Sequence, residues 1–231
     1  TLFSPLKSID AEIQLPKVDV VIMNPPFTRQ ESLEKEQKER YISRFIKYNL
    51  VDKRIGLHGY FILLGNKFLK DNGVMGLVLP ATVLRIESFT KLRKFIVENF
   101  EIKFLISSNK SSSFSYGSRF REILLVIKKT KPKKSNKIRV GALNEKPVIG
   151  KNVKNIIDGL TKKSIKNSKE MELIDIDNEI FYKNYQNLFK FISLSKEKVY
   201  QAYEKIYSNN KKLIKFNEYC KIHDHKLIRG W

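Results

Sequence analysis

The stretch "VDVVIMNPPFTRQ", residues 18–30, decides the fold of this chain. Its first six residues form a short, nearly unbroken apolar run, which is typical of a strand buried on both faces of a parallel sheet. Two prolines and an aromatic residue follow directly. We therefore predict a buried strand at 18–23 that ends in a stiff turn beginning at Asn24.

Helical and extended patterns alternate after this strand. The predicted elements are, in order, helices at 31–49 and 59–70, a strand at 73–80, a helix at 87–100, and strands at 101–107 and 122–129. Asn72-Gly73 indicates the end of the second helix. No helix separates the last two strands, so we expect them to pair antiparallel. The order of elements indicates an α/β fold.

The composition changes near residue 130. Residues 131–170 contain 12 Lys or Arg against 3 acidic residues. We predict one domain over residues 1–130, followed over 131–231 by a basic, mostly helical connector. This connector includes a short strand at 137–143 and a helix at 195–210, for which Ser195 is a plausible N-cap.

The net charge points to the partner. The chain carries 45 Lys and Arg against 24 acidic residues, a formal charge of +21. Such a surplus is typical of proteins that bind nucleic acid, although a generally lysine-rich proteome also produces it. No apolar run is long enough to span a membrane. A single cysteine excludes a disulfide framework and favours a cytoplasmic location.

The turn at Asn24-Pro25-Pro26-Phe27 follows the strand at its carboxyl end, where ligands bind in open α/β sheets. The prolines fix φ and remove backbone donors, so the turn is stiff and its carbonyl oxygens are available to a ligand. Asn24 adds a side-chain acceptor and Phe27 adds a flat apolar face. These groups suit an exocyclic amino group on a planar heterocycle, held for attack on an electrophile.

The same residues resemble a known family. "DVVIMNPPF" is similar to the catalytic motif of adenine-N6 DNA methyltransferases, which use S-adenosylmethionine. The segments "GYFILLGNKFLKDNGVMGLVLPATVL" and "KLRKFIVENFEIKFLIS" resemble the parts that follow this motif in Type I modification subunits and Type IIG restriction–modification enzymes of the gamma class. The resemblance covers about residues 15–130 and implies a Rossmann-like methyltransferase sheet.

The resemblance also implies roles for individual residues. Asn24 and Pro25 would accept hydrogen bonds from the adenine amino group, with Pro26 stiffening the turn. Phe27 would stack on an adenine rotated out of the duplex. A second aromatic residue is expected before the last strand; Phe114 is the candidate for this stacking role, and Tyr116 and Phe120 are its rivals. Asp19 would have a structural role.

The family's methyl-donor loop, an aromatic-x-Gly-x-Gly turn, is absent from this sequence. We therefore expect the chain to be a fragment that lacks the first strands of the sheet, and to bind the donor weakly. Strand 18–23 would then form an apolar sheet edge. Expected partners are double-stranded DNA, together with a specificity subunit or a separate N-terminal half. Residues 131–231 would lead into a target-recognition region.

Other signals favour no different chemistry. Cys220, His223 and His225 lie close together, but only Asp224 is near as a fourth ligand, so no metal site is expected. His58 is expected to be structural or solvent-facing. The alternatives are an RNA guanine-N2 methyltransferase, a protein-glutamine methyltransferase, and a non-catalytic DNA-binding or assembly module.

Overall fold

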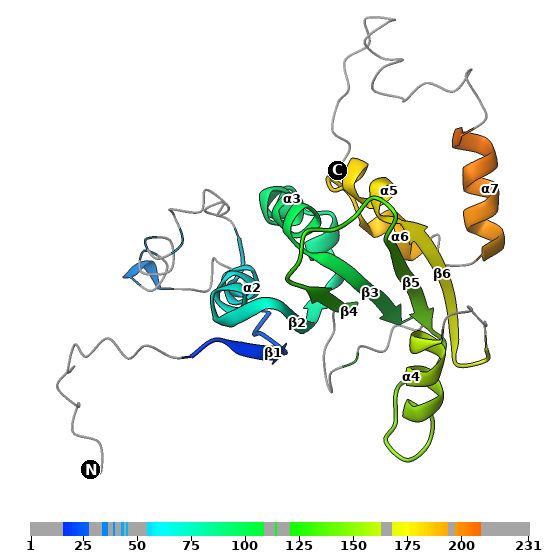
Figure 1. Ribbon diagram of the computed structural model, residues 1–231, viewed down its shortest axis with the longest axis horizontal. Helices are drawn as coiled ribbons and strands as arrows, with labels where there is room; N and C mark the ends of the chain where they lie inside the picture. Colours follow the sequence, from blue (N-terminus) through cyan, green and yellow to red (C-terminus); the bar gives the residue numbers. More distant parts are fainter. Residues whose placement is uncertain are drawn as a thin grey trace, which may run out of the picture.

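A mixed sheet of six strands is the centre of the protein (Figure 1). The computed structural model describes residues 16–27, 34–36, 39, 43, 45, 55–108, 114, 121–162, 168–193 and 197–208. The strands are β1 (Val18–Met23), β2 (Leu69–Pro80), β3 (Glu101–Ser108), β4 (Glu122–Lys128), β5 (Lys137–Leu143) and β6 (Met171–Asp177). Their spatial order is β1-β2-β4-β3-β5-β6. Strands β4 and β6 run against the other four, and the α/β fold class is confirmed.

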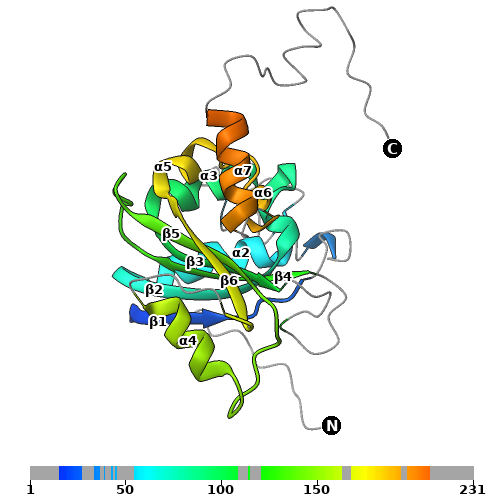
Figure 2. The ribbon, with the colours of Figure 1, turned by 90° about the vertical axis from the view of Figure 1, so that its right-hand side faces the viewer.

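Helices cover the two faces of the sheet unequally (Figures 1 and 2). One face carries α2 (Leu57–Phe68), α3 (Thr90–Asn99), α5 (Asn178–Lys183) and α6 (Phe189–Ser193), with α7 (Glu197–Ser208) beside them. The 3₁₀ turns η3 (Ala81–Leu84) and η4 (Glu87–Phe89) connect β2 to α3. The opposite face carries α4 (Val153–Thr161). No helix in the described part of the chain is long and apolar enough to cross a lipid bilayer.

Two apolar clusters follow from this arrangement. The larger cluster lies between the sheet and the helices of the first face, and alternate residues of β2 such as Leu77 and Leu79 point into it. The smaller cluster lies under α4, where Ile156 packs with Leu143 and Leu173. Since both faces of the central strands are covered, these strands are buried as the sequence predicted.

The pairing of strands agrees with the sequence in its main features. Strands β3 and β4 are antiparallel, as expected for neighbours without an intervening helix. Strand β5 forms where the sequence predicts a strand, and it pairs parallel with β3. Strand β6 was not predicted; it pairs with β5 and extends the same sheet. The division of the chain near residue 130 stays a prediction, although this sheet continues across it.

Asn72-Gly73 was expected to end a helix, and this prediction is wrong. Helix α2 ends at Phe68, and β2 begins at the next residue. Asn72 has a φ of 64° inside β2, at a bulge where Val18 and Val20 of β1 face Leu69 and Val74. At Gly73, a Cβ atom would lie 2.9 Å from the Asp19 carbonyl oxygen, so β1 approaches closely only because the residue is glycine.

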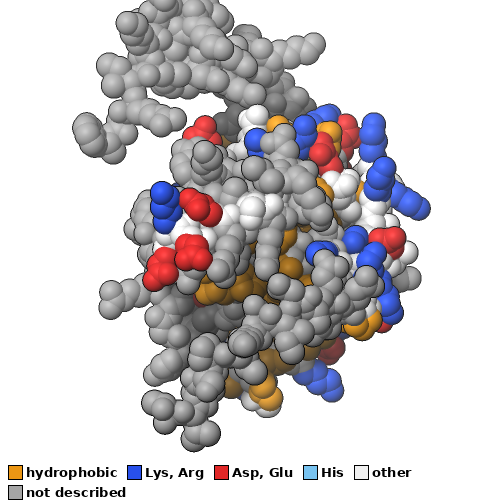
Figure 3. Space-filling model, turned by 90° about the vertical axis from the view of Figure 1, so that its left-hand side faces the viewer, with side chains coloured by type: hydrophobic (Ala, Val, Ile, Leu, Met, Phe, Trp, Pro, Cys, Tyr) orange, Lys and Arg blue, Asp and Glu red, His pale blue; other side chains and the backbone are white. Residues whose placement is uncertain are grey.

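Strand β1 was expected to be buried on both faces, and the structure shows instead that it is an edge strand. Among the described strands it pairs only with β2, and Val18, Val20 and Ile22 are 39%, 57% and 82% exposed. The expected apolar sheet edge is therefore present. Figure 3, viewed from the side of β1, shows hydrophobic side chains open at the surface. Of the helix predicted at 31–49, six residues are described, and Phe45 among them is buried in the larger cluster.

Candidate active site

The Asn24–Phe27 corner lies where β1 ends, at the edge of the sheet formed by the carboxyl ends of its parallel strands. Asn24 and Pro26 are exposed, Pro25 is buried, and Phe27 is half-buried. Burial of Pro25 anchors the turn, while Asn24 lies at the surface. The corner therefore offers a polar side chain and an aromatic ring side by side on a stiff backbone.

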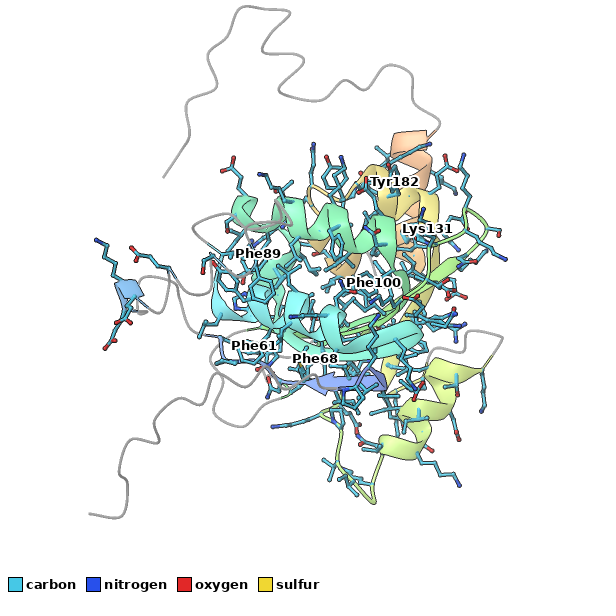
Figure 4. All side chains as sticks on the ribbon, turned by 60° about the vertical axis from the view of Figure 1, so that its left-hand side comes forward. Phe61, Phe68, Phe89, Phe100, Lys131 and Tyr182 are labelled. Carbon is cyan, nitrogen blue, oxygen red and sulfur yellow. The ribbon has the colours of Figure 1, made fainter. Side chains whose placement is uncertain are left out.

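Two further rings stand behind Phe27. His58, in the first turn of α2, stacks on Phe89 with 4.9 Å between ring centroids and 11° between planes. Phe27 meets the His58 ring at 80°, with the centroids 6.2 Å apart. Phe89 comes from η4, which follows β2 at the same edge of the sheet (Figure 4). A wall built from three separate segments of sequence therefore supports the motif's aromatic ring.

His58 is buried and uncharged. Neither of its ring nitrogens has a hydrogen-bond partner within the described ranges. Burial lowers the pKa of His58 to about 4, because the imidazolium form cannot be hydrated there. The imidazole is therefore neutral at physiological pH, and the wall behind Phe27 carries no charge.

Arginine side chains lie along the same edge of the sheet. Arg85 follows η3 and Arg121 precedes β4; both are exposed, and their guanidinium carbons lie 5.0 Å and 5.7 Å from the ring centroid of Phe189. Arg121 Nε also donates a hydrogen bond to Ser107 Oγ over 3.1 Å. Because both cations are exposed near the carboxyl ends of the strands, this edge is able to contact an anionic ligand.

Arg93 holds the loop that carries Phe89. This α3 side chain is fully buried and donates five hydrogen bonds of 2.7–2.9 Å. Its acceptors are the carbonyl oxygens of Val83, Ile86, Tyr185 and Gln186 and the Thr90 hydroxyl. Burial lowers its pKa to about 10, so the guanidinium remains charged at neutral pH. No local pattern in the sequence marks Arg93, because two of its five acceptors, the carbonyl oxygens of Tyr185 and Gln186, lie 92 and 93 positions away.

Phe114, the second candidate for stacking on the base, does not contact Phe27. Phe114 packs against the cluster under α4, whereas Phe27 packs on His58 at the opposite face, and no ring contact joins the two. Tyr116 and Phe120 lie outside the described residues. The stacking role of Phe114 stays a prediction.

Asp19 has a structural contact. Its two carboxylate oxygens accept hydrogen bonds from Lys70 Nζ over 3.1 Å and 2.9 Å. This ion pair links β1 to β2, its only neighbour in the sheet. It is exposed, so its contribution to stability is below about 1 kcal/mol.

Cys220, His223, Asp224 and His225 lie outside the described residues, as does Ser195. Among the residues whose placement is described, no three His, Cys, Asp or Glu side chains cluster as metal ligands would. Two cavities, of about 230 Å³ beside α4 and about 420 Å³ beside α5, contain no residue of the motif.

Comparison with known proteins identifies the segment around the motif. Residues 6–114 match the model of the family described as Eco57I restriction-modification methylase. The Type II methyltransferase M.BstVI of Geobacillus stearothermophilus is 30% identical over 112 residues, which are 48% of this chain and 19% of that protein. The chain thus spans about a fifth of the length of this relative.

Solved structures show the same fold. The type IIG restriction endonuclease BpuSI matches with a TM-score of 0.60 and 19% identity, over 85% of this chain and 23% of that one. A type I restriction-modification methyltransferase subunit from Streptococcus thermophilus matches with a TM-score of 0.56 and 21% identity, over 78% and 38% of the two chains. The family match confirms the resemblance found in the sequence around the motif.

Proposed function

We propose, from the match of residues 6–114 to the family model of Eco57I restriction-modification methylases, that the protein methylates DNA in a restriction–modification system. The proposed acceptor is the N6 amino group of an adenine rotated out of the duplex. One observation carries the proposal: the corner at the carboxyl end of β1 combines exposed Asn24, buried Pro25 and half-buried Phe27.

The corner acts on the acceptor. The Asn24 side-chain oxygen and the Pro25 carbonyl oxygen would each accept a hydrogen bond from one N–H of the amino group. Pro26 has no backbone N–H and so cannot compete as a donor to these oxygens. This grip would direct the nitrogen lone pair outward and stabilise the positive charge that develops as the nitrogen reacts. The Phe27 ring would stack on the base. Little conformational entropy would be lost in ordering this ring, because the His58–Phe89 pair already holds it in place.

The proposed methyl donor is S-adenosylmethionine, and the residues of this chain do not fit it. The sequence has no aromatic-x-Gly-x-Gly turn. We assign donor binding to a part of the sheet outside this chain. The open edge of β1, with exposed Val20 and Ile22, supports this assignment because soluble proteins rarely leave such a strand unpaired.

A methylation assay tests the proposed function. The chain would be supplied with its donor-binding half, as one polypeptide or two, and offered duplex DNA, ribosomal RNA and protein in turn. We expect tritiated methyl groups on adenine in DNA, and 10²- to 10³-fold slower labelling with Asn24→Ala. Label on guanine in RNA, or on glutamine in protein, would replace the proposal with one of the alternative acceptors.

Calorimetry tests the assignment of the donor half. Titration of S-adenosylmethionine into the 231-residue chain should give no binding at micromolar concentration, and binding should appear when the donor half is added. Micromolar binding to the chain alone would contradict the assignment. Absence of both binding and methylation with the two parts together would leave a non-catalytic assembly module as the function.

A further inference from the structure

The turn between β5 and α4 presents an apolar side chain among lysines. We define residues 146–154 as the β5–α4 turn. Ile149 at its tip is 93% exposed, and Val148 beside it is half-exposed. The ammonium groups of Lys146, Lys151 and Lys154 come from exposed residues on either side of this tip. Glu145, which precedes the turn in sequence, is half-buried and contacts Asn152 Nδ2.

This turn is rigid rather than a loose loop. Lys151 N donates to the Val148 carbonyl oxygen over 3.1 Å, and Gly150 has a φ of 79°, which together define a type II turn. Buried Asn152 locks it from inside: its Oδ1 accepts from Val148 N over 2.8 Å and its Nδ2 donates to the Lys146 carbonyl oxygen over 3.1 Å. The exposed position of Ile149 is therefore fixed by the fold.

Strand direction places the turn at the edge that carries Asn24. Strands β1, β2, β3 and β5 are parallel, so the residues after β5 leave the sheet on the same side as the residues after β1. Four steps between strands separate β1 from β5. At about 4.8 Å a step, the two sites are about 19 Å apart along the sheet, which is about the length of six base pairs at 3.4 Å each.

Three other lysines of residues 131–170 lie at the opposite edge of the sheet. Lys131, Lys133 and Lys134 belong to the turn between β4 and β5, at the amino ends of the parallel strands. Figure 4 shows Lys131 and Phe89 at opposite ends of the sheet. Of these two turns, the β5–α4 turn shares an edge with the Asn24 corner, and the β4–β5 turn is a control of equal charge.

We propose that the β5–α4 turn is a DNA contact, in which its three lysines bind phosphates and Ile149 enters a groove of the duplex. This inference rests on the proposed function. Lysines neutralise phosphates and release counterions, and apolar tips of this kind pack against sugars or between base steps. A protein partner fits less well, because lysine is depleted in the buried centre of protein interfaces.

Fluorescence anisotropy with a labelled 20-base-pair duplex tests the inference on the 231-residue chain, between 50 and 200 mM salt. The triple variant K146Q/K151Q/K154Q should bind at least tenfold more weakly at 50 mM salt. Its plot of log affinity against log salt should be shallower by about 2.7, since each phosphate contact contributes about 0.9. The control K131Q/K133Q/K134Q removes the same charge and should leave the slope unchanged.

Ile149 requires a separate variant. Ile149→Ser should weaken DNA binding about tenfold without changing the salt slope, because it removes apolar contact and no charge. Circular dichroism would verify that each variant keeps its fold. Equal weakening by the two triple variants would overturn the inference, since it would reduce the effect to overall charge. Unchanged binding by Ile149→Ser would overturn the groove contact.

Failure of the inference is distinguishable from failure of the proposed function. A chain that binds no duplex overturns both. A chain that binds DNA, with the K146Q/K151Q/K154Q variant equal to the wild type, overturns only the inference. Binding to phosphatidylserine vesicles is the remaining measurement. If the K146Q/K151Q/K154Q variant loses vesicle binding but keeps DNA binding, the turn binds anionic lipid and the inference is overturned.

Discussion

Acid should destabilise this protein through His58 before it affects most carboxylates. The pKa of His58 is about 4 in the folded chain, against 6.5 for an ordinary histidine. The folded state therefore binds fewer protons than the unfolded state between these values. Stability is complete above pH 6.5 and falls as the pH decreases toward 4. This difference in pKa lowers the free energy of unfolding by about 3 kcal/mol in total, and by about 2 kcal/mol at pH 5.

Urea unfolding at pH 7.5, 6.0 and 5.0 measures this loss. Circular dichroism is the suitable probe, because Trp231, the single tryptophan, lies outside the described residues. His58→Phe is the matched variant, since a phenyl ring keeps the stacking on Phe89 and cannot titrate. Carboxylate effects are common to both proteins and cancel in the difference.

The wild type should lose about 2 kcal/mol more than His58→Phe between pH 7.5 and 5.0. Parallel loss in both proteins would refute the burial argument for His58, because it would show that the imidazole accepts a proton in the folded state without penalty. Since the His58 ring touches Phe27, protonation should also loosen the support of the motif over the same pH range.

Further predictions concern the corner, the arginine and the glycines. Asn24→Ala should lower the rate of methyl transfer by 10²- to 10³-fold, as expected for one lost transition-state hydrogen bond, with unchanged thermal unfolding because the residue is exposed. Arg93→Met should destabilise the fold by about 3–5 kcal/mol in urea unfolding, because buried carbonyl oxygens lose their donors. The control Lys94→Met, at the half-exposed neighbouring position, should change stability by less than about 0.5 kcal/mol. Gly141→Ala should cost about 1–3 kcal/mol, since its Cβ would lie 2.5 Å from the Glu172 carbonyl oxygen; Gly76→Ala, where nothing lies within 4 Å, should be neutral in the same melt. Retained activity in Asn24→Ala would contradict the first prediction. Equal stability of Arg93→Met and Lys94→Met, or of Gly141→Ala and Gly76→Ala, would contradict the other two.

Local pattern was enough to predict much of the sheet. The apolar runs at β3 and β4 and the lack of a helix between them determine an antiparallel pair, and both features are local. The Asn-Pro-Pro-Phe turn is likewise determined by four consecutive residues, so its position at the strand end was correct. Its role in binding an amino group stays a proposal.

What the sequence did not reveal depends on contacts between distant segments. Asn72-Gly73 is a typical helix stop, yet here it forms a bulge that lets β2 follow β1 past the Asp19 carbonyl group. Arg93 reads as an ordinary surface residue of an amphipathic helix, because its acceptors at Tyr185 and Gln186 are more than 90 positions away. His58 appeared as a lone residue, and only the fold places it between Phe27 and Phe89.

The corner at Asn24 depends on the strand with the least support. Strand β1 has one neighbour, whereas β2, β3, β4 and β5 each have two, and alternate side chains of β1 are exposed. An edge strand opens more readily than a central one. Of the two edge strands of the sheet, β6 is mostly buried and β1 is mostly exposed, so we expect β1 to open more readily than the other strands. Because a hydrogen-bonding corner needs a fixed geometry, a second strand paired with β1 would do more than cover Val20 and Ile22. It would fix the acceptor corner in the same step that brings a donor site beside it, which links assembly of the sheet to catalysis.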